Sequence, residues 1–197
     1  MTGNLICLVR HGETEWNAEQ RRQGHLDSPL TEKGRLQAVT NARNLQRRLS
    51  LDGDVAVYSS PLGRARQTAL IMVAELELPE DEIVYEPRLM EASFGIWEGL
   101  TETEIRAQFP ASLKARSDNR WNVPAPSGES YADVQARVAD WYAQASLAET
   151  TIVVCHGLTS RVFRGIYADI PKEQVINLPE PQDAYFELQG GTIALVD

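Results

Sequence analysis

The stretch LICLVRHGETEWN, residues 5–17, is the most informative part of the sequence. It opens with the short apolar run LICLV, which ends abruptly in Arg10, His11 and Gly12. A short apolar run that stops at polar and glycine residues is typical of a strand buried on both faces of a sheet. A purely structural strand has no use for these three residues at its end, so we expect them to serve a functional site.

The rest of the chain alternates between strand-like and helix-like segments. Short apolar runs predict further strands at 55–58, 83–85 and 151–155. Apolar residues at helical spacing, together with capping residues, predict helices at 31–49, 61–76, 101–109, 131–145 and 158–167. We expect a turn at 52–54 and mostly loop at 110–128, because the second stretch holds several prolines.

Strands that alternate with helices indicate an α/β fold. We predict a three-layer α/β/α arrangement around a mostly parallel, mixed central sheet. The first four strands are expected to be parallel, and the segments 184–188 and 192–196, which flank a glycine turn, should add an antiparallel hairpin. Residues 1–197 are expected to form a single domain, with residues 87–128 as a lid-like insertion over one edge of the sheet.

The composition is that of an ordinary globular protein, and it narrows the class of partner. A net charge of −9 argues against binding to nucleic acid or to a membrane surface. The two cysteines, Cys7 and Cys155, lie inside apolar runs and are expected to be buried and unpaired. Residues 1–4 lack the features of a signal peptide, and no apolar run approaches the ~18 residues of a spanning helix. We therefore expect a cytoplasmic location.

Three of the predicted strands end in polar residues that suit one task. These residues are Arg10, His11 and Gly12 after the first strand, Arg64 and Arg66 after the second, and His156 and Gly157 after the fourth. In open α/β sheets, ligands bind outside the carboxyl ends of the strands. We therefore expect these side chains to meet at one edge of the sheet.

This set of residue types fits the handling of a phosphoryl group. Arginine offers a planar fork of donors to phosphate oxygens, and glycine lets the backbone come close to a ligand. Positive charge near His11 disfavours its imidazolium form, and neutral imidazole is a nucleophile that can attack phosphorus. Glu91, after the third strand, is the candidate proton donor to the leaving oxygen, with Glu98 as the alternative.

A zinc site built from Cys7, His11, Cys155 and His156 would have suitable residue types. It conflicts with the strand pattern, because Cys7 should point into the core and because Cys155 and His156 should face opposite ways. We therefore predict no metal site.

Six sequence blocks carry a resemblance to a known family. They are RHGETEWN (10–17), DSPLTEKGRLQA (27–38), YSSPLGRARQTA (58–69), LMEASFGIWEG (89–99), SGESYADVQARV (127–138) and VVCHGLTSR (153–161). In this order and at these spacings, they resemble the histidine phosphatase superfamily in its phosphoglycerate mutase-like branch. The resemblance implies a phosphoglycerate mutase-like fold and an enzyme that works without a metal or another cofactor.

The resemblance also implies a role for each matching residue. His11 would accept the phosphoryl group, Glu91 would donate the proton, and His156 would complete the phosphate pocket. The residues implied to hold the phosphoryl oxygens are Arg10 and Arg64, helped by Arg66. The residues implied to line the mouth of the pocket are Asn17, Gln23 and Gly24.

Two departures from the family's mutases favour a phosphatase. Mutases commonly carry an arginine directly after the acidic glutamate, where this chain has Ala92, and their insertion is longer and holds further basic residues. The shorter segment here still offers Lys114, Arg116 and Arg120 to the pocket. We therefore predict hydrolysis of a small phosphorylated metabolite through a phosphohistidine on His11.

Two other functions stay open. A 2,3-bisphosphoglycerate-dependent phosphoglycerate mutase would share the chemistry as far as the phosphoenzyme and would then return the phosphate to another hydroxyl. A non-catalytic ligand sensor is disfavoured, because every core position of the family pattern is filled. No helix face is marked as a contact surface, so a homodimer stays open beside a monomer.

Overall fold

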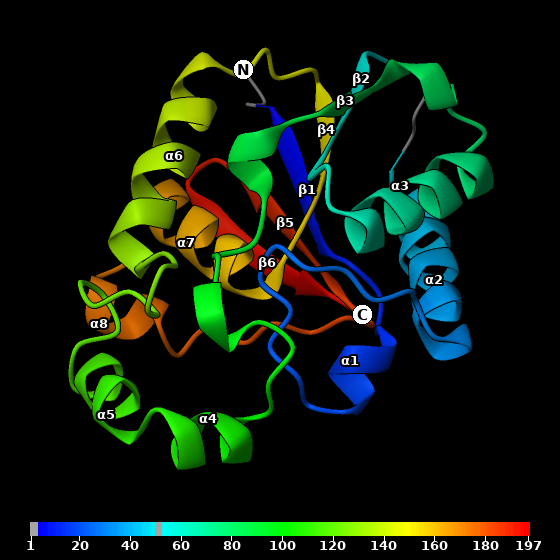
Figure 1. Cartoon of the computed structure of the whole chain (residues 1–197). Coiled ribbons are helices and arrows are strands. Elements are labelled where there is room, and N and C mark those ends of the chain that lie inside the picture. Colours follow the sequence, from blue (N-terminus) through cyan, green and yellow to red (C-terminus); the bar gives the residue numbers. More distant parts are fainter. Residues whose placement is uncertain (1–3, 50–52) are drawn as a thin grey trace.

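The fold is built on a six-stranded sheet (Figure 1). The computed structural model describes residues 4–49 and 53–197. The strands lie across the sheet in the order β3-β2-β4-β1-β5-β6. Their bounds are Leu5–Arg10 for β1, Val55–Ser59 for β2, Ile83–Tyr85 for β3, Thr150–Cys155 for β4, Tyr185–Gln189 for β5 and Thr192–Val196 for β6.

The sheet is mixed, as predicted. β1, β2, β3 and β4 pair in parallel, whereas β5 is antiparallel to both β1 and β6. The α-helices are α1 (Glu15–Ala18), α2 (Glu32–Arg48), α3 (Gly63–Glu75), α4 (Glu102–Gln108), α5 (Pro110–Asp118), α6 (Tyr131–Gln144), α7 (Gly157–Tyr167) and α8 (Lys172–Val175).

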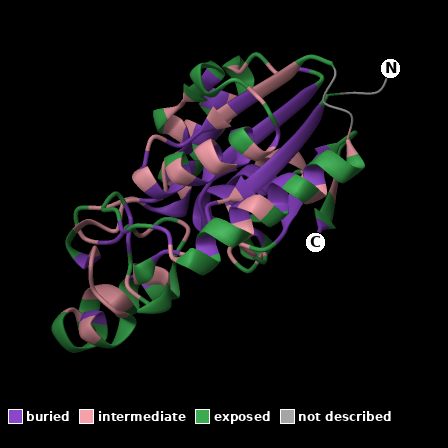
Figure 2. Ribbon diagram, turned by 90° about the vertical axis from the view of Figure 1, so that its right-hand side faces the viewer, coloured by how far each residue is buried: buried purple, intermediate pink, exposed green. Residues whose placement is uncertain are grey.

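The fold has three layers, because helices cover both faces of the sheet and an apolar core lies between the sheet and the helices on each face. Alternate residues of β1 point to opposite faces, so Cys7 packs with α2 and α3, whereas Leu8 packs with α6 and α7. Figure 2 shows the buried strands between helices that are exposed on their outer sides. Cys7 and Cys155 belong to the two different cores, and no group of three or more metal-binding side chains is present within residues 4–49 and 53–197.

The register of the central strands brings the two histidines together. Arg10 ends β1 opposite Cys155, which ends β4, and the N–H of His11 donates to the carbonyl of Cys155 over 3.0 Å. β2 flanks β4 on its other side, so Ser60 leaves the sheet next to His156. The parallel pairing therefore sets three polar side chains side by side at one edge.

Some predicted boundaries were wrong, for identifiable reasons. The first part of the expected loop at 110–128 is helix α5, because Pro110 occupies the first helical position, where no N–H is needed. Helix α3 begins at Gly63 rather than at Pro61, because the carboxylate of Asp27 accepts from the N–H of Gly63 over 2.6 Å and caps the helix there. Of the expected turn at 52–54, residue Asp52 lies outside the described residues.

The segment that holds α4 and α5 extends beyond the carboxyl ends of the strands, in the lower part of Figure 1. It has a small core of its own around Trp97, Ile105 and Ala125. The lid-like behaviour of residues 87–128 stays a prediction. Within the part of the chain that is described, no helix has the length and apolar character needed to cross a membrane.

Candidate active site

A cavity of about 370 Å³ opens at the carboxyl ends of β1 and β4, a size that suits a small metabolite. Its seven arginines are Arg10, Arg21, Arg22, Arg64, Arg116, Arg120 and Arg161. Its three glutamates are Glu91, Glu102 and Glu180. The lining is therefore cationic although the whole chain carries a net charge of −9, and such a lining favours an anionic ligand.

His11 lies at the wall of this cavity and is 3% exposed. Its Nδ1 is 2.7 Å from the carbonyl oxygen of Gly12, which can only accept, so the ring proton sits on Nδ1. Burial, and then the charges of Arg64 and Arg10, hold the pKa of His11 well below its usual value of 6.5. The ring is therefore neutral, with an unprotonated Nε2 that carries a lone pair.

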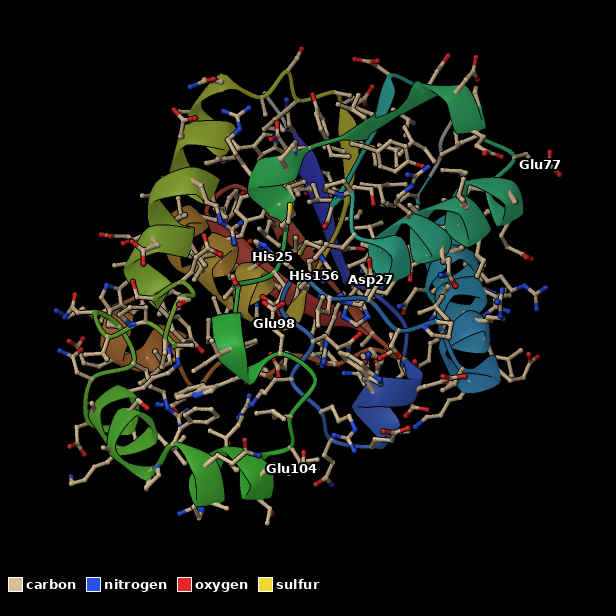
Figure 3. All side chains as sticks on the ribbon, in the orientation of Figure 1. His25, Asp27, Glu77, Glu98, Glu104 and His156 are labelled. Atoms are coloured by element: carbon tan, nitrogen blue, oxygen red, sulfur yellow. The ribbon has the colours of Figure 1, made fainter. Side chains whose placement is uncertain are left out.

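Arg64 donates a hydrogen bond to this nitrogen and so fixes the orientation of the ring. Its Nε donates to His11 Nε2 over 3.3 Å, and its side chain is 1% exposed. The other end of the guanidinium donates to the carbonyl of Gly24 over 2.8 Å, to the carbonyl of Leu26 over 2.9 Å and to Asp27 Oδ1 over 2.9 Å. Asp27, labelled in Figure 3, thus both caps α3 and anchors the arginine that α3 presents.

His156 lies beside His11 and is completely buried; the two ring centroids are 5.2 Å apart. Its Nε2 is 2.7 Å from Ser60 Oγ, whereas its Nδ1 has no hydrogen-bond partner among the described residues. Burial, and then the positive charge of Arg64, hold the pKa of His156 well below its usual value of 6.5. Both histidines of the site are therefore neutral.

Arg10 is anchored by a segment that the sequence did not mark. Its Nη1 donates to the carbonyl of Glu180 over 2.5 Å. The Glu180 carboxylate lines the cavity 3.5 Å from Nη2 of Arg161, and Arg161 Nε donates to the carbonyl of Leu178 over 2.6 Å. Residues 178–180 carry no motif, and only the return of the chain from α8 to β5 brings them to the site.

Glu91 also lines the cavity and caps α7 from outside the helix. Its carboxylate accepts from its neighbour Ala92 N–H over 2.9 Å, from Leu158 N–H over 3.2 Å and from Thr159 N–H over 3.3 Å. The last two N–H groups belong to the first turn of α7, which has no cap from the side chain of His156. The helix that follows β4 thus fixes the candidate proton donor.

Arg137 on α6 is a positioning residue that sequence reasoning missed. It donates to the carbonyl of Met90 over 2.8 Å and to that of Glu91 over 3.1 Å, and its Nε forms a 2.9 Å ion pair with Glu129. These bonds hold the backbone on both sides of the Glu91 side chain. Arg137 lies inside the block SGESYADVQARV, so the resemblance was the one signal that could have marked it.

The residues predicted for the pocket mouth, Asn17, Gln23 and Gly24, all line the cavity, as does Gly157. Gly12 lies outside this lining, and its approach to the substrate stays a prediction. A Cβ at Gly12 would overlap the carbonyl of Gly34, so this glycine lets the segment after β1 pack against the start of α2.

Other predicted residues do not come together with the site. Arg66 is exposed and outside the cavity lining, and its guanidinium lies 4.6 Å from the ring centroid of Tyr85. Glu98, the alternative acid, lies outside the lining and accepts from the N–H groups of His25 and Phe94, each over 3.0 Å. Lys114 forms an exposed ion pair with Asp118 at 2.7 Å, whereas Arg116 and Arg120 do reach the cavity.

Comparison with known proteins identifies the family. The profile of the histidine phosphatase superfamily (branch 1) matches residues 6–189, so the chain belongs to this superfamily. A metal-independent phosphoserine phosphatase of Arabidopsis thaliana is 39% identical over 170 residues, which cover 84% of this chain and 68% of that protein. A 2,3-bisphosphoglycerate-dependent phosphoglycerate mutase of Bartonella bacilliformis is 30% identical over 176 residues, 87% of this chain and 84% of that one.

A solved structure shares the whole fold. The mycobacterial glucosyl-3-phosphoglycerate phosphatase is 28% identical, with a TM-score of 0.77 over 98% of this chain and 97% of that one. The chain therefore has the three-layer, phosphoglycerate mutase-like fold expected from its sequence.

Proposed function

We propose that the chain is a cytoplasmic, metal-independent phosphatase that hydrolyses a small phosphorylated metabolite through a phosphohistidine on His11. The state of His11 carries this proposal: it is buried at the cavity wall, neutral, and its Nε2 is directed at a cavity-lining arginine. Two free, buried cysteines support a reducing compartment.

The reaction begins with the phosphoryl oxygens held by Arg10 and Arg64. On substrate binding, Arg64 exchanges its hydrogen bond to His11 for one to a phosphoryl oxygen. His11 Nε2 then attacks phosphorus, the P–O bond to the leaving group breaks, and Glu91 gives its proton to the departing oxygen. In the second step, water attacks the phosphohistidine, Glu91 takes a proton from it, and the P–N bond breaks to release inorganic phosphate. Positioning and stabilisation of charge supply most of the rate.

The substrate class follows from the outer wall of the cavity. Arg116 is only 7% exposed, and its Nη1 donates to the carbonyls of Val123 over 2.8 Å and Glu129 over 3.2 Å. It has no carboxylate partner among the described residues. Burial first, and then the like charges of Arg22 and Arg120, lower the pKa of Arg116. A buried guanidinium beside two others is costly until an anion joins it.

We therefore infer that this wall receives a second negative group of the substrate, as in a phosphorylated hydroxy acid or amino acid. The guanidinium carbons of Arg22 and Arg116 lie 5.4 and 5.7 Å from the ring centroid of Phe94, so one aromatic side chain orders both cations. The names of the relatives support the inference, because phosphoserine and glucosyl-3-phosphoglycerate are both phosphoesters that carry a carboxylate.

A screen with two readouts on the same samples tests the proposal. One readout follows inorganic phosphate across phosphoglycerates, phosphoamino acids, sugar phosphates and nucleotides, with and without a chelator. The other follows 2-phosphoglycerate formed from 3-phosphoglycerate, with and without 2,3-bisphosphoglycerate. We expect chelator-resistant phosphate release that disappears in His11→Ala. Isomer formation that outpaces release would make the chain a mutase, and undiminished release by His11→Ala would refute the phosphohistidine.

A further inference from the structure

Ser60 and His156 form a buried pair that the mechanism above leaves unused. Both residues are 0% exposed, and 2.7 Å separates Ser60 Oγ from His156 Nε2. The other ring nitrogen, Nδ1, is buried and has no hydrogen-bond partner within the described part of the chain. Buried polar atoms are nearly always bonded, so an orphaned nitrogen in an active site points to a missing ligand atom.

Counting protons decides the direction of the Ser60–His156 hydrogen bond. His156 is neutral, so its ring carries one N–H. Ser60 Oγ already accepts from the N–H of Leu62 over 3.3 Å. Among the described residues, its own proton has one acceptor in reach, which is Nε2 of His156.

If Ser60 donates to Nε2, its proton is bonded and the ring N–H lies on Nδ1. In the opposite arrangement Nε2–H donates to Ser60, the hydroxyl proton is left without an acceptor, and Nδ1 is a bare buried lone pair. The first arrangement leaves one unsatisfied group and the second leaves two. Because each unsatisfied buried group is costly, the first arrangement is the stable one.

We propose that Ser60 is a positioning residue: it fixes His156 as the Nδ1–H tautomer, so that the neutral ring donates a hydrogen bond to an oxygen of the bound phosphoryl group. The inference rests on the proposed function, because it assigns the acceptor to the substrate.

The topology supports the direction of this donor. β4 lies between β2 and β1, so His156 stands between Ser60 on one side and His11 on the other. The two nitrogens of an imidazole point in divergent directions, so a ring that turns Nε2 to Ser60 turns Nδ1 away from it, toward the side of His11. At this place the neutral Nδ1–H donates a hydrogen bond to the phosphoryl group in addition to those from the cationic Arg10 and Arg64. His156 does not need to become an imidazolium in a buried site.

Side-chain ¹⁵N NMR of the intact protein tests the tautomer directly. The chain has three histidines, so the variants His25→Gln and His11→Gln assign the signals of His156 by elimination. We expect the shift of a protonated nitrogen at Nδ1 and of an unprotonated one at Nε2. A protonated Nε2 in the wild-type chain would overturn the proposal, and this measurement needs no variant at Ser60.

Kinetics of matched variants test the consequence. Ser60→Ala should lower kcat by about 10- to 100-fold, the range found when the partner that orients a metal-binding histidine is removed. It should also weaken binding of inorganic phosphate and shift His156 toward the Nε2–H form. Ser60→Thr keeps the hydroxyl and should restore most of the loss.

Ser59→Ala is the control, because Ser59 is equally buried but its Oγ donates to the carbonyl of Ser60 rather than to the ring. If Ser60→Ala and Ser59→Ala behave alike in kcat, phosphate affinity and tautomer, the role of Ser60 is refuted while the phosphatase stands. If the wild-type chain cleaves no phosphoester, the proposed function fails, and the NMR spectrum with the phosphate titration still decides whether Ser60 sets the tautomer.

Discussion

Replacing Arg120 and Arg116 with methionine tests whether the outer wall binds a second negative group. Arg120 lines the cavity and makes no hydrogen bond or ion pair within the described residues, so methionine removes its charge without breaking a contact. Arg116 is buried, and its replacement removes a desolvated cation together with two bonds to backbone carbonyls. The two variants therefore sample an exposed and a buried charge of the same wall.

The burial of each side chain sets the expected magnitude. An exposed charge pair contributes about 0.2–1 kcal/mol, so Arg120→Met should lower kcat/KM for an acidic substrate by at most about fivefold. A buried hydrogen bond to a charged group is worth about 1.5–3 kcal/mol, so Arg116→Met should lower it by about 10- to 150-fold.

The assay compares 3-phosphoglycerate with glycerol 3-phosphate, which differ in that a hydroxymethyl group replaces the carboxylate. We expect both variants to lose activity on the acid and to keep it on the neutral-tailed ester. Lys114→Met is the control, because Lys114 lies on the same helix as Arg116 but pairs with Asp118 outside the cavity. Equal losses on both substrates, or an unchanged preference in Arg116→Met, would refute the reasoning.

Three further predictions concern acidity, packing and a residue outside the site. The folded state lowers the pKa of His11 and His156, so below about pH 6.5 these two residues bind protons in the unfolded chain but not in the folded one. The free energy of unfolding should therefore fall by about 1.4 kcal/mol per pH unit for each histidine as the pH is lowered. Urea unfolding between pH 7.5 and 5.5 should show a shallower dependence of this free energy on pH in His156→Gln. Gly12→Ala should cost about 1–3 kcal/mol in thermal unfolding, since its Cβ would overlap the carbonyl of Gly34; an unchanged Tm would contradict this. Arg66→Ala should leave kcat/KM unchanged, and a large loss would show that Arg66 reaches the substrate.

The features that could be predicted from the sequence are those written in short stretches. The buried run before Arg10 fixes β1, and a parallel sheet necessarily gathers the ends of its strands at one edge, so His11 and His156 had to meet. The residue types alone then indicated that these side chains could hold a phosphoryl group and attack it. The glycine turn after β5 likewise marked the terminal hairpin.

The features that escaped prediction depend on contacts between distant segments. Arg64 and Arg66 lie two positions apart on one helix, so their side chains point in nearly opposite directions. The sequence pattern alone did not show which of them would face His11. The bonds from Arg137 to the backbone around Glu91 join residues more than forty positions apart, and no local pattern records them. The close approach of Gly12 to Gly34 also escaped prediction, because the two glycines lie far apart in the sequence.

The way in which the inner arginines are anchored explains how an acidic protein keeps a cationic cavity. Arg10 is held by the carbonyl of Glu180 and Arg116 by two carbonyls, while Arg64 has two carbonyls and a single carboxylate. A carbonyl satisfies an N–H donor and orients the guanidinium without cancelling its charge. On the outer surface, by contrast, Arg88 is paired with two carboxylates. The fold therefore orients the inner arginines mainly through carbonyl groups, while their charge is left for the phosphoryl group and the second anion of the substrate.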